Sequence, residues 1–426
     1  MRIRSDIFVL LALVLSLASC AKTSVVKPYD DSNDSSDPMQ FGTASEALQQ
    51  VPTKATLLQD GFVVSCWKKF GSTDEQTVMD DYQVKYKSDG WNNTSKWEYA
   101  SGNDGLSFYK HQPQRYWDYS AFPYQFCAVT PATVNPAETD LIAGYSLTST
   151  SLTIPTSAEY RFQTYEGGSV TGGSEPYLVA QVRRAADGKD TDVLSNSSDK
   201  EINKTSGSTL NRKVALPFHH LTSKVRFGIY TSDLGSLSDP IPVKNLVVKV
   251  VSSSFATAAS GYTSSWTAAN GGMMSGSFTT FTRSTSPSVQ LASTVGTTIE
   301  GDVSQCTKPS DAYYFGCTDG ILQIPQTGVK LTVSFDIEAK MVDEMLLNSN
   351  SNITYDAVSR TTHYTDIPVV AKLEDGSTVS SYDWASGYIY TYNIVVNRFS
   401  VLPFEFTATV TPWENISGSL DTDLEK

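Results

Sequence analysis

The sequence predicts an all-β protein built from β-sandwiches, and three observations lead to this fold class. Apolar residues alternate with polar ones in many short runs, which is typical of strands that bury one face. Clusters of Gly, Asn, Asp, Ser and Pro separate these runs and indicate turns. Aromatic residues make up 11% of the chain and charged residues only 18%. Two packed sheets are an economical way to bury such one-sided strands.

The first residues have the pattern of a secretory signal. Arg2 and Arg4 precede an uncharged apolar run, residues 7–17, which ends at the small residues Ala18 and Ser19. This run is too short to span a bilayer, which needs about 20 residues in a helix. We therefore expect a segment that is removed during export.

Cys20 ends this signal, because Leu17-Ala18-Ser19-Cys20 resembles the bacterial lipobox. In that motif the cysteine thiol receives diacylglycerol and becomes the first residue of a lipoprotein after cleavage. Several acyl chains hold a protein stably on a membrane, whereas one chain is marginal. Residues 1–20 are thus expected to be a lipoprotein signal ending at Cys20, with a chance cysteine in a secreted protein as the alternative. Residues 21–37 follow as an acidic tether with nothing to bury.

The strand pattern is clearest in residues 330–340, KLTVSFDIEAK, where five apolar residues share one face: Leu331, Val333, Phe335, Ile337 and Ala339. Five further runs are predicted to be strands: residues 175–184, 223–232, 245–251, 387–397 and 404–413. Residues 252–288 are rich in Ser and Thr but keep spaced aromatic residues. We expect weak strands and loops there, on a wet surface.

The length of the chain predicts two domains. About 400 residues follow the signal, which is more than one hydrophobic core usually serves. A polar stretch, residues 194–212, separates two strand-rich halves. We place the N-terminal sandwich at residues 38–217 and the C-terminal sandwich at residues 218–426.

Four cysteines remain after Cys20, and export permits disulfides among them. Four thiols allow three connectivities. Position in the chain favours a Cys66–Cys127 pair within the N-terminal domain and a Cys306–Cys317 pair close in sequence. Buried free thiols are the alternative, because spacing alone does not fix the geometry of a disulfide.

No nucleic acid partner and no catalytic centre are indicated. A net charge of -13 argues against binding to nucleic acid or to an anionic membrane face. No zinc, nucleotide, calcium or hydrolase motif occurs, so we predict no metal, no cofactor and no enzymatic activity. His219 and His220 are expected to be a half-buried pair at a strand edge. Aromatic residues in residues 115–126 could stack on sugar rings, but such residues in strands are more often core.

The succession of motifs along the chain is more specific than any one of them. After the lipobox come MQFGTA, PTKAT, GFVVSCW, KYKSDGWNNTSKWEY, QRYWDYSAFPYQFCAVTP, ALPFHHLTSKVRFGIY, GYIYTYNIVVNRF and FEFTATVTPWE. This order is similar to that of the fimbrillin, or Mfa-like, family of the Bacteroidetes, whose members are subunits of type V pili. The matched positions include Tyr116-Trp117-Asp118, Phe126-Cys127-Ala128, Phe218, His220, Ser223-Lys224-Val225 and Thr411-Pro412-Trp413.

The resemblance implies two transthyretin-like β-sandwich domains in tandem and assembly by strand exchange. In such proteins a lipoprotein precursor carries an early strand that closes a groove in its N-terminal sandwich. A protease removes this strand, and a strand from the C-terminal region of another subunit fills the vacancy. The inserted strand supplies both ladder hydrogen bonds and apolar side chains. Acidic residues soon after Cys20 also resemble the signal that sends such lipoproteins to the outer face of the outer membrane, a plain linker being the alternative.

On this sequence, the removable strand corresponds to residues around Met39 to Ala44, and the cut falls between Lys54 and Ala55. The family pattern has an arginine before the cleaved bond, but no Arg occurs between Arg4 and Arg115. A protease that accepts lysine could act here. Otherwise the subunit stays uncleaved as an anchor or accessory member, or Lys54 is only a linker residue.

The donor strand is expected in residues 402–426, where four residues form an apolar stripe: Phe404, Phe406, Ala408 and Val410. An ordinary final strand within its own domain is the alternative. The sequence thus predicts a structural fimbrial subunit that supports adhesion or biofilm formation. Its partners are other pilin subunits and, through the lipid anchor of the precursor, the outer membrane; its final location is the cell-surface fimbrium. A monomeric surface lipoprotein that binds glycans is the second hypothesis.

Overall fold

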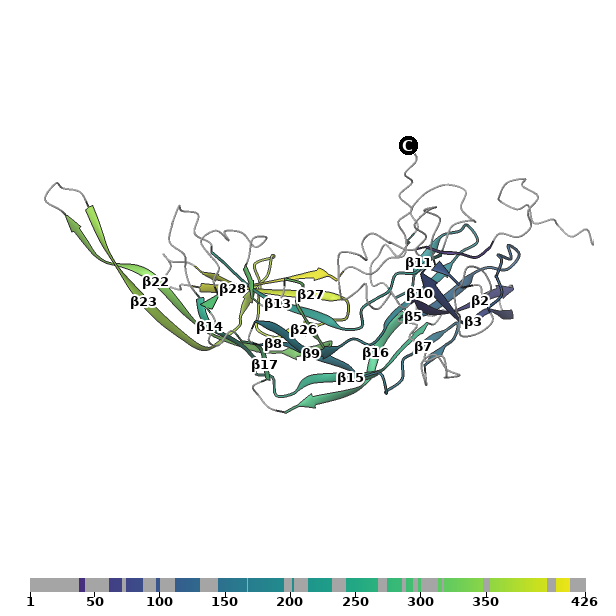
Figure 1. Cartoon of the computed structure of the whole chain (residues 1–426), viewed down its shortest axis with the longest axis horizontal. Helices are drawn as coiled ribbons and strands as arrows, with labels where there is room; N and C mark the ends of the chain where they lie inside the picture. Colours follow the sequence, from purple (N-terminus) through teal and green to yellow (C-terminus); the bar gives the residue numbers. More distant parts are fainter. Residues whose placement is uncertain are drawn as a thin grey trace, which may run out of the picture.

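A computed structural model describes residues 38–42, 61–70, 74–86, 97–99, 112–130, 145–166, 168–194, 201–202, 214–231, 243–266, 274–285, 289–293, 298–299, 313–315, 318–347, 353–396 and 404–413. All regular elements in these ranges are β-strands, which confirms the predicted all-β fold class. None of the described residues forms a helix long and apolar enough to cross a membrane. The strands lie in an elongated body with an eight-stranded sheet toward one end (Figure 1).

The eight-stranded sheet is built from residues of the expected N-terminal domain. Its strands, in spatial order, are β11 (Asp190–Asp192), β10 (Leu178–Arg184), β5 (Tyr124–Thr130), β2 (Phe62–Phe70), β3 (Asp74–Tyr86), β4 (Trp97–Glu98), β1 (Phe41–Gly42) and β12 (Val214–Ala215). Strands near both ends of this order share one hydrophobic core, with Val182 of β10 and Val214 of β12 among its members. The sheet therefore curves around its own core, as the two layers of a sandwich do.

Two further sheets face each other, and most of their strands come from the later part of the chain. The seven-stranded sheet contains β19 (Tyr313–Phe315), β13 (Ser223–Thr231), β27 (Tyr388–Val396), β28 (Phe404–Pro412), β24 (Ala371–Lys372) and β25 (Thr378–Val379), with β20 (Ile321–Gln323) paired to β13. A small two-stranded sheet joins β21 (Gln326–Val329) and β26 (Tyr382–Trp384). Buried residues of β13, β27 and β28 form one core with residues of β14 and β22 from the opposite sheet.

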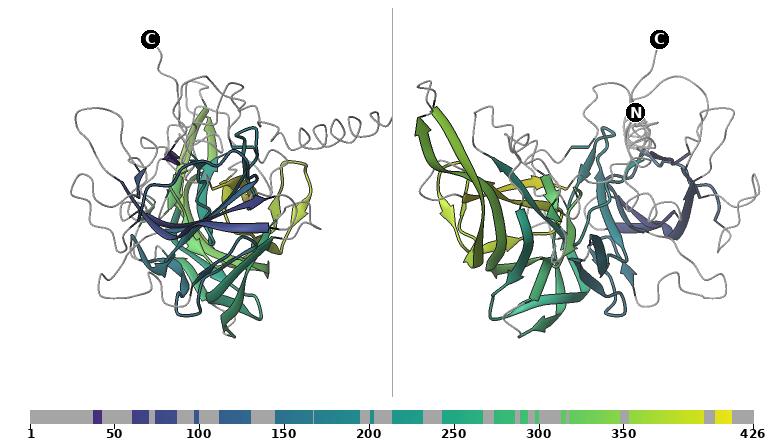
Figure 2. Two further views of the ribbon diagram at one scale, coloured as in Figure 1. Left: turned by 90° about the vertical axis from the view of Figure 1, so that its right-hand side faces the viewer. Right: turned by 60° about the vertical axis from the view of Figure 1, so that its left-hand side comes forward.

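That opposite sheet has eleven strands. They are β23 (Ile353–Pro368), β22 (Leu331–Leu347), β14 (Val243–Val250), β17 (Val289–Ser293), β8 (Tyr160–Glu166), β15 (Phe255–Trp266), β7 (Ser151–Thr153) and β6 (Ser146–Leu147), with β16 (Met274–Ser284), β18 (Thr298–Ile299) and β9 (Ser169–Ser174) paired at its sides. The pairing of β22 with β14 ends at Ile337, whereas its pairing with β23 continues to Leu347. The outer part of β22 and β23 is thus a two-stranded ribbon that projects from the body (Figures 1 and 2).

The sheets are not divided where the domains are expected to divide. Strands β6 to β9, residues 146–174, lie within the predicted N-terminal domain but belong to the eleven-stranded sheet. Their core also takes in Val129 and Val179, which lie on β5 and β10 of the eight-stranded sheet. The domain boundary between residues 217 and 218 stays a prediction. A third hydrophobic core contains residues from both sides of this boundary, such as Val179 and Ala256.

Residues 252–288 differ from the expectation of weak strands and loops. They contain β15 and β16, which pair over ten residue positions as a long antiparallel hairpin. Phe255, Tyr262 and Phe278 are buried there. The spaced aromatic residues of this segment therefore supply part of the core.

Candidate functional site

The short strand β1 occupies a groove in the eight-stranded sheet, enclosed on both sides. Phe41 is opposite Trp97 of β4 in an antiparallel pair and opposite Val214 of β12 in a parallel pair. Pro38 forms an isolated bridge with Tyr116. A segment from the start of the chain is thus held between two walls that come from much later residues.

Two side chains of this segment, Met39 and Phe41, fill the floor of the groove. Met39 is 0% exposed and Phe41 only 2%. The Phe41 ring makes edge contacts with Phe62, Tyr99 and Phe126, at centroid distances of 5.7, 5.8 and 6.1 Å. Gln40 between them is exposed. The segment therefore has the alternation of a strand that completes a core.

The backbone of the segment is held by hydrogen bonds from both walls. Met39 N donates to the Arg115 carbonyl oxygen at 2.8 Å, and Val214 N donates to the Gln40 carbonyl oxygen at 2.8 Å. The Tyr99 hydroxyl donates to the Met39 carbonyl oxygen at 3.0 Å, and the Arg115 carbonyl oxygen is a second acceptor at 3.2 Å. These contacts involve only the main chain of residues 39 and 40, so they fix direction and register without requiring particular side chains.

Tyr99 is itself positioned by neighbouring donors. Gln114 Nε2 donates to the Tyr99 hydroxyl oxygen at 2.7 Å and Arg115 N donates to it at 3.1 Å. Burial raises the pKa of Tyr99 well above its ordinary value, and the hydrogen bond with the Arg115 backbone offsets this only in part. The hydroxyl therefore keeps its proton at all physiological pH values and remains a donor to β1.

A buried ion pair supports the β12 wall. Arg184 donates to both carboxylate oxygens of Asp190, at 2.6 and 2.8 Å, and both side chains are at most 1% exposed. Asp190 also accepts a hydrogen bond from Ala215 N at 3.0 Å, and the Arg184 guanidinium lies 4.7 Å from the centre of the Trp117 ring. Because Ala215 belongs to β12, this network anchors the strand that pairs with β1.

The expected removable strand is thus part of the folded core where it is described. Residues 38–42 lie in the groove, whereas Thr43 and Ala44 fall outside the described residues. Cys20, Lys54, Ala55, Cys306 and Cys317 also lie outside them, so lipidation, cleavage and the second cysteine pair stay predictions.

The expected donor strand, β28, pairs within its own domain. It lies between β27, along its whole length, and β24, at Phe406 and Thr407. Phe406 and Ala408 are buried and Phe404 is half-buried, but Val410 is 51% exposed. The apolar stripe therefore reaches the core through its first three members only. In this structure β28 is paired as a strand of its own sheet, and its use as a donor strand stays a prediction.

The predicted Cys66–Cys127 disulfide is wrong, because both residues are buried free thiols. Their strands are neighbours, but Cys66 is opposite Phe126 while Cys127 is opposite Ser65. Successive residues of a strand point to opposite faces, so the two sulfur atoms lie on opposite sides of the sheet. Burial raises the pKa of Cys66 well above its ordinary value and that of Cys127 to about 12.

The two adjacent histidines each contact one carboxylate. His219 Nε2 lies 2.7 Å from Asp192 Oδ2, and His220 Nδ1 lies 2.7 Å from Glu175 Oε2. No cluster of three metal-ligating groups occurs within the described ranges. In the aromatic run, Trp117, Tyr124 and Phe126 belong to the core and Tyr116 is 48% exposed.

Sequence reasoning missed Tyr99, Gln112 and Gln114. Gln112 is 2% exposed, accepts from Gln83 N at 2.7 Å and donates to the Tyr99 carbonyl oxygen at 2.5 Å, thereby bridging β3 and the end of β4. No local pattern distinguishes these side chains, because their partners lie in distant segments.

Fold and site together define an all-β protein whose N-terminal core is completed by a short strand, β1, from far upstream in the chain. A family model described as fimbrillin-like matches residues 53–413, which is most of the chain. The chain belongs to the fimbrillin-like family. It is therefore a structural, pilin-like subunit of a cell-surface fimbria, which interacts with other pilin subunits and is not an enzyme.

Two solved structures are similar over nearly their whole length. A fimbrial protein from Bacteroides vulgatus has 12% identity and a TM-score of 0.45, covering 89% of this chain and 99% of that chain. A proposed cell adhesion protein from Bacteroides uniformis has 15% identity and a TM-score of 0.32, covering 89% and 100%. No curated protein matches the sequence.

Proposed function

We propose that this subunit is exported as a lipoprotein through Cys20 and assembles by strand exchange after proteolysis. In this proposal β1 is the removable strand, the cut falls at Lys54–Ala55, and the C-terminal strand of another subunit fills the groove. The resulting fimbria supports adhesion or biofilm formation. The enclosure of Met39 and Phe41 between β4 and β12 is the observation that carries the proposal.

The energetics of the groove support this mechanism. Burial of one large apolar side chain contributes about 1.5–3 kcal/mol, so Met39 and Phe41 together contribute about 3–6 kcal/mol. Loss of β1 would also leave backbone donors and acceptors of two walls without partners, at about 1–3 kcal/mol for each group that stays buried. A strand that restores both terms would bind strongly, whereas an intact precursor offers no vacancy.

A controlled cut tests the proposal. Residues 52–57 are replaced by the recognition sequence of a site-specific protease, and the purified precursor is analysed by size-exclusion chromatography and by electrophoresis in mild detergent. We expect monomers before the cut and oligomers that resist the detergent after it. Material that remains monomeric after complete cleavage would overturn the proposal.

A peptide competition shows whether the groove is the site of assembly. A synthetic peptide of residues 38–44, PMQFGTA, should suppress oligomers when it is added in excess during the cut, because it refills the groove. A peptide of the same composition in scrambled order is the matched control and should leave assembly unchanged. Equal effects of both peptides would count against the groove.

A further inference from the structure

The four residues that enter the groove have a counterpart at the start of β28. Pro38-Met39-Gln40-Phe41 and Pro403-Phe404-Glu405-Phe406 share the order proline, large apolar residue, amide or carboxylate of Gln or Glu, and phenylalanine. Of the four positions, two have identical residues, and the residues at the other two are similar in size or shape. The two matching segments are thus the removable strand and the expected donor strand.

The two segments also have the same exposure pattern. Met39 and Phe41 are buried while Gln40 is exposed. In β28, Phe406 is buried, Phe404 is half-buried and Glu405 is exposed. Each segment therefore presents its two large apolar side chains to one face and its polar side chain to the other.

We infer that Phe404-Glu405-Phe406 of a second copy takes the place of Met39-Gln40-Phe41, in the same direction and with Phe406 in the Phe41 position. This inference rests on the proposed strand exchange and adds its register. The incoming strand then runs parallel to β12 and antiparallel to β4, as β1 does.

The walls of the groove accept this replacement because they contact the backbone. In the inferred register, Phe404 N donates to the Arg115 carbonyl, and Tyr99 donates to the Phe404 carbonyl. Val214 N donates to the Glu405 carbonyl. Methionine and phenylalanine are both large and apolar, so the Met39 site takes Phe404 with a small adjustment.

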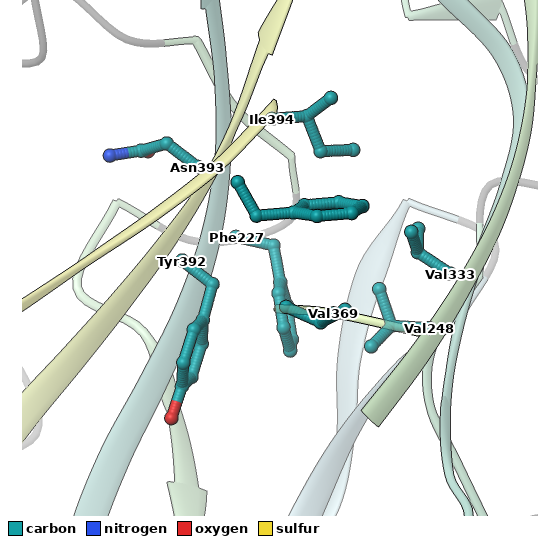
Figure 3. A pocket seen from close by; sticks show the side chains of 8 residues that line it. Phe227, Val248, Val333, Val369, Tyr392, Asn393 and Ile394 are labelled. Carbon is teal, nitrogen blue, oxygen red and sulfur yellow. The ribbon is translucent and has the colours of Figure 1, made fainter. Parts of the chain in front are cut away.

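The position that Phe406 leaves lies in the C-terminal core. Phe406 lines an apolar cavity between the two C-terminal sheets, together with Phe227, Val248, Val333, Val369, Tyr392, Asn393 and Ile394 (Figure 3). In β28 the Phe406 ring contacts Phe404, which also contacts Phe335 and Tyr364. In the groove, the Phe41 ring has three aromatic neighbours. The Phe41 site therefore offers Phe406 an aromatic environment like the one that it leaves.

One difference between the two segments provides a test. Phe41 is opposite Trp97 in an antiparallel pair, and extending this register by one residue places Gln40 opposite Glu98. Glu405 would take the Gln40 position and face Glu98. Like charges directly opposite each other on neighbouring strands are unfavourable. Replacing Glu405 by glutamine should therefore strengthen assembly if this register is correct.

The first experiment is a disulfide cross-link in the precursor with the site-specific cut. Glu98→Cys with Gln40→Cys is the positive control, since opposed residues of antiparallel strands lie within disulfide range, and it should cross-link within one chain before the cut. Glu98→Cys with Glu405→Cys should form an interchain disulfide only after the cut. Glu98→Cys with Thr409→Cys, four residues further along β28, should not. Peptide mass mapping identifies each disulfide.

The second experiment measures the charge effect without cysteines. Glu405→Gln should increase the yield of oligomers about two- to fivefold. Glu374→Gln, also an exposed glutamate of the C-terminal part, is the matched control and should have no effect.

The outcomes separate the register from the exchange itself. Oligomers that form without the 98–405 disulfide, or with the 98–409 disulfide, would overturn the register while leaving strand exchange in place. An absence of oligomers from the unsubstituted precursor after the cut would overturn the strand exchange on which the register depends.

Discussion

Tyr99 fixes the position of β1, and although it ends the motif KYKSDGWNNTSKWEY, nothing in that motif indicates this role. Its hydroxyl donates to the Met39 carbonyl and accepts from Gln114 and Arg115. The chain has 22 Tyr, and the partners of this one lie in loops that no periodic pattern connects to it. The wrong prediction of a Cys66–Cys127 disulfide has the same cause. The face on which a residue lies depends on strand register, and the spacing of two cysteines in the sequence carries no information on register.

Removal of the Tyr99 hydroxyl is expected to loosen the groove. Tyr99→Phe leaves buried partners without a hydrogen bond and should lower the free energy of unfolding by about 1–3 kcal/mol. After the cut, the β1 peptide should also dissociate faster. Urea denaturation of the uncut protein and mass spectrometry of the released peptide measure the two effects.

Tyr82→Phe is the matched control for this substitution. The Tyr82 hydroxyl accepts from Arg115 Nε at 2.8 Å and is thus next to the groove, but the bond does not involve β1. It should cost stability without accelerating release of the peptide. Equal release rates for both variants would mean that Tyr99 does not hold the strand.

Among the elements, strands of strong alternation were predicted well and their partners were not. Residues 330–340, 387–397 and 404–413 coincide closely with β22, β27 and β28 or parts of them. Alternation reports one buried face but carries no information on which strand lies beside it. The sequence therefore could not indicate that the four strands from β6 to β9 belong to the eleven-stranded sheet.

A cluster of Trp413, His220, Lys224 and Glu175 connects the end of β28 with the segment before β13. The Trp413 ring stacks on His220 at a centroid distance of 3.4 Å, and Lys224 Nζ lies 4.4 Å from the centre of the same ring. Glu175 accepts from Leu221 N, Thr222 N and the Thr222 hydroxyl, and contacts His220. This cluster links the loop before β10, which contains Glu175, to the start of β13 and the end of β28.

Acid should weaken this cluster. Burial alone would raise the pKa of Glu175, but the charge of His220 and the hydrogen bonds from His220 and Thr222 outweigh burial and hold it below its ordinary value. A carboxyl group with such a depressed pKa stabilises the fold above its unfolded pKa, and this contribution is lost as the pH falls through the folded value. Glu175→Gln should therefore destabilise the fold near neutral pH, and this cost should decline as the pH falls below the ordinary glutamate pKa of about 4.3 and through the lower folded value.

Denaturation curves of the parent and the Glu175→Gln variant over this pH range measure the difference. Glu159→Gln is the control, because Glu159 pairs with Arg161 at the surface. It should differ little from the parent at any pH. A Glu175→Gln penalty that is constant with pH would show that the carboxylate charge contributes nothing.

At the scale of the whole molecule, the sequence predicts a fimbrial subunit correctly because the motifs that resemble the family occur in order along most of the chain. The family match over residues 53–413 agrees with it. The lipid anchor and the cut rest on short segments outside the described residues. They depend on recognition by other proteins, and the fold alone does not determine them.

The N-terminal residue of the protein recovered from cells tests both the lipid anchor at Cys20 and the cut between Lys54 and Ala55. We expect lipidated Cys20 at the start of the membrane-bound precursor and Ala55 at the start of subunits in fimbriae, as measured by mass spectrometry of each fraction. Cys20→Ser should remove the protein from the membrane fraction, whereas Ser19→Ala keeps a small residue before the cysteine and should not. Fimbrial subunits that still begin at Cys20 would contradict cleavage at Lys54–Ala55.

The pairing of Phe41 with Val214 has a consequence for biogenesis. A large part of the chain lies between these two residues. Synthesis proceeds from the N-terminus, so β1 emerges long before the wall that encloses it exists. Contacts between such distant residues also form slowly. The groove is therefore sealed late in folding, because β1 has to wait for β12 before it is enclosed on both sides.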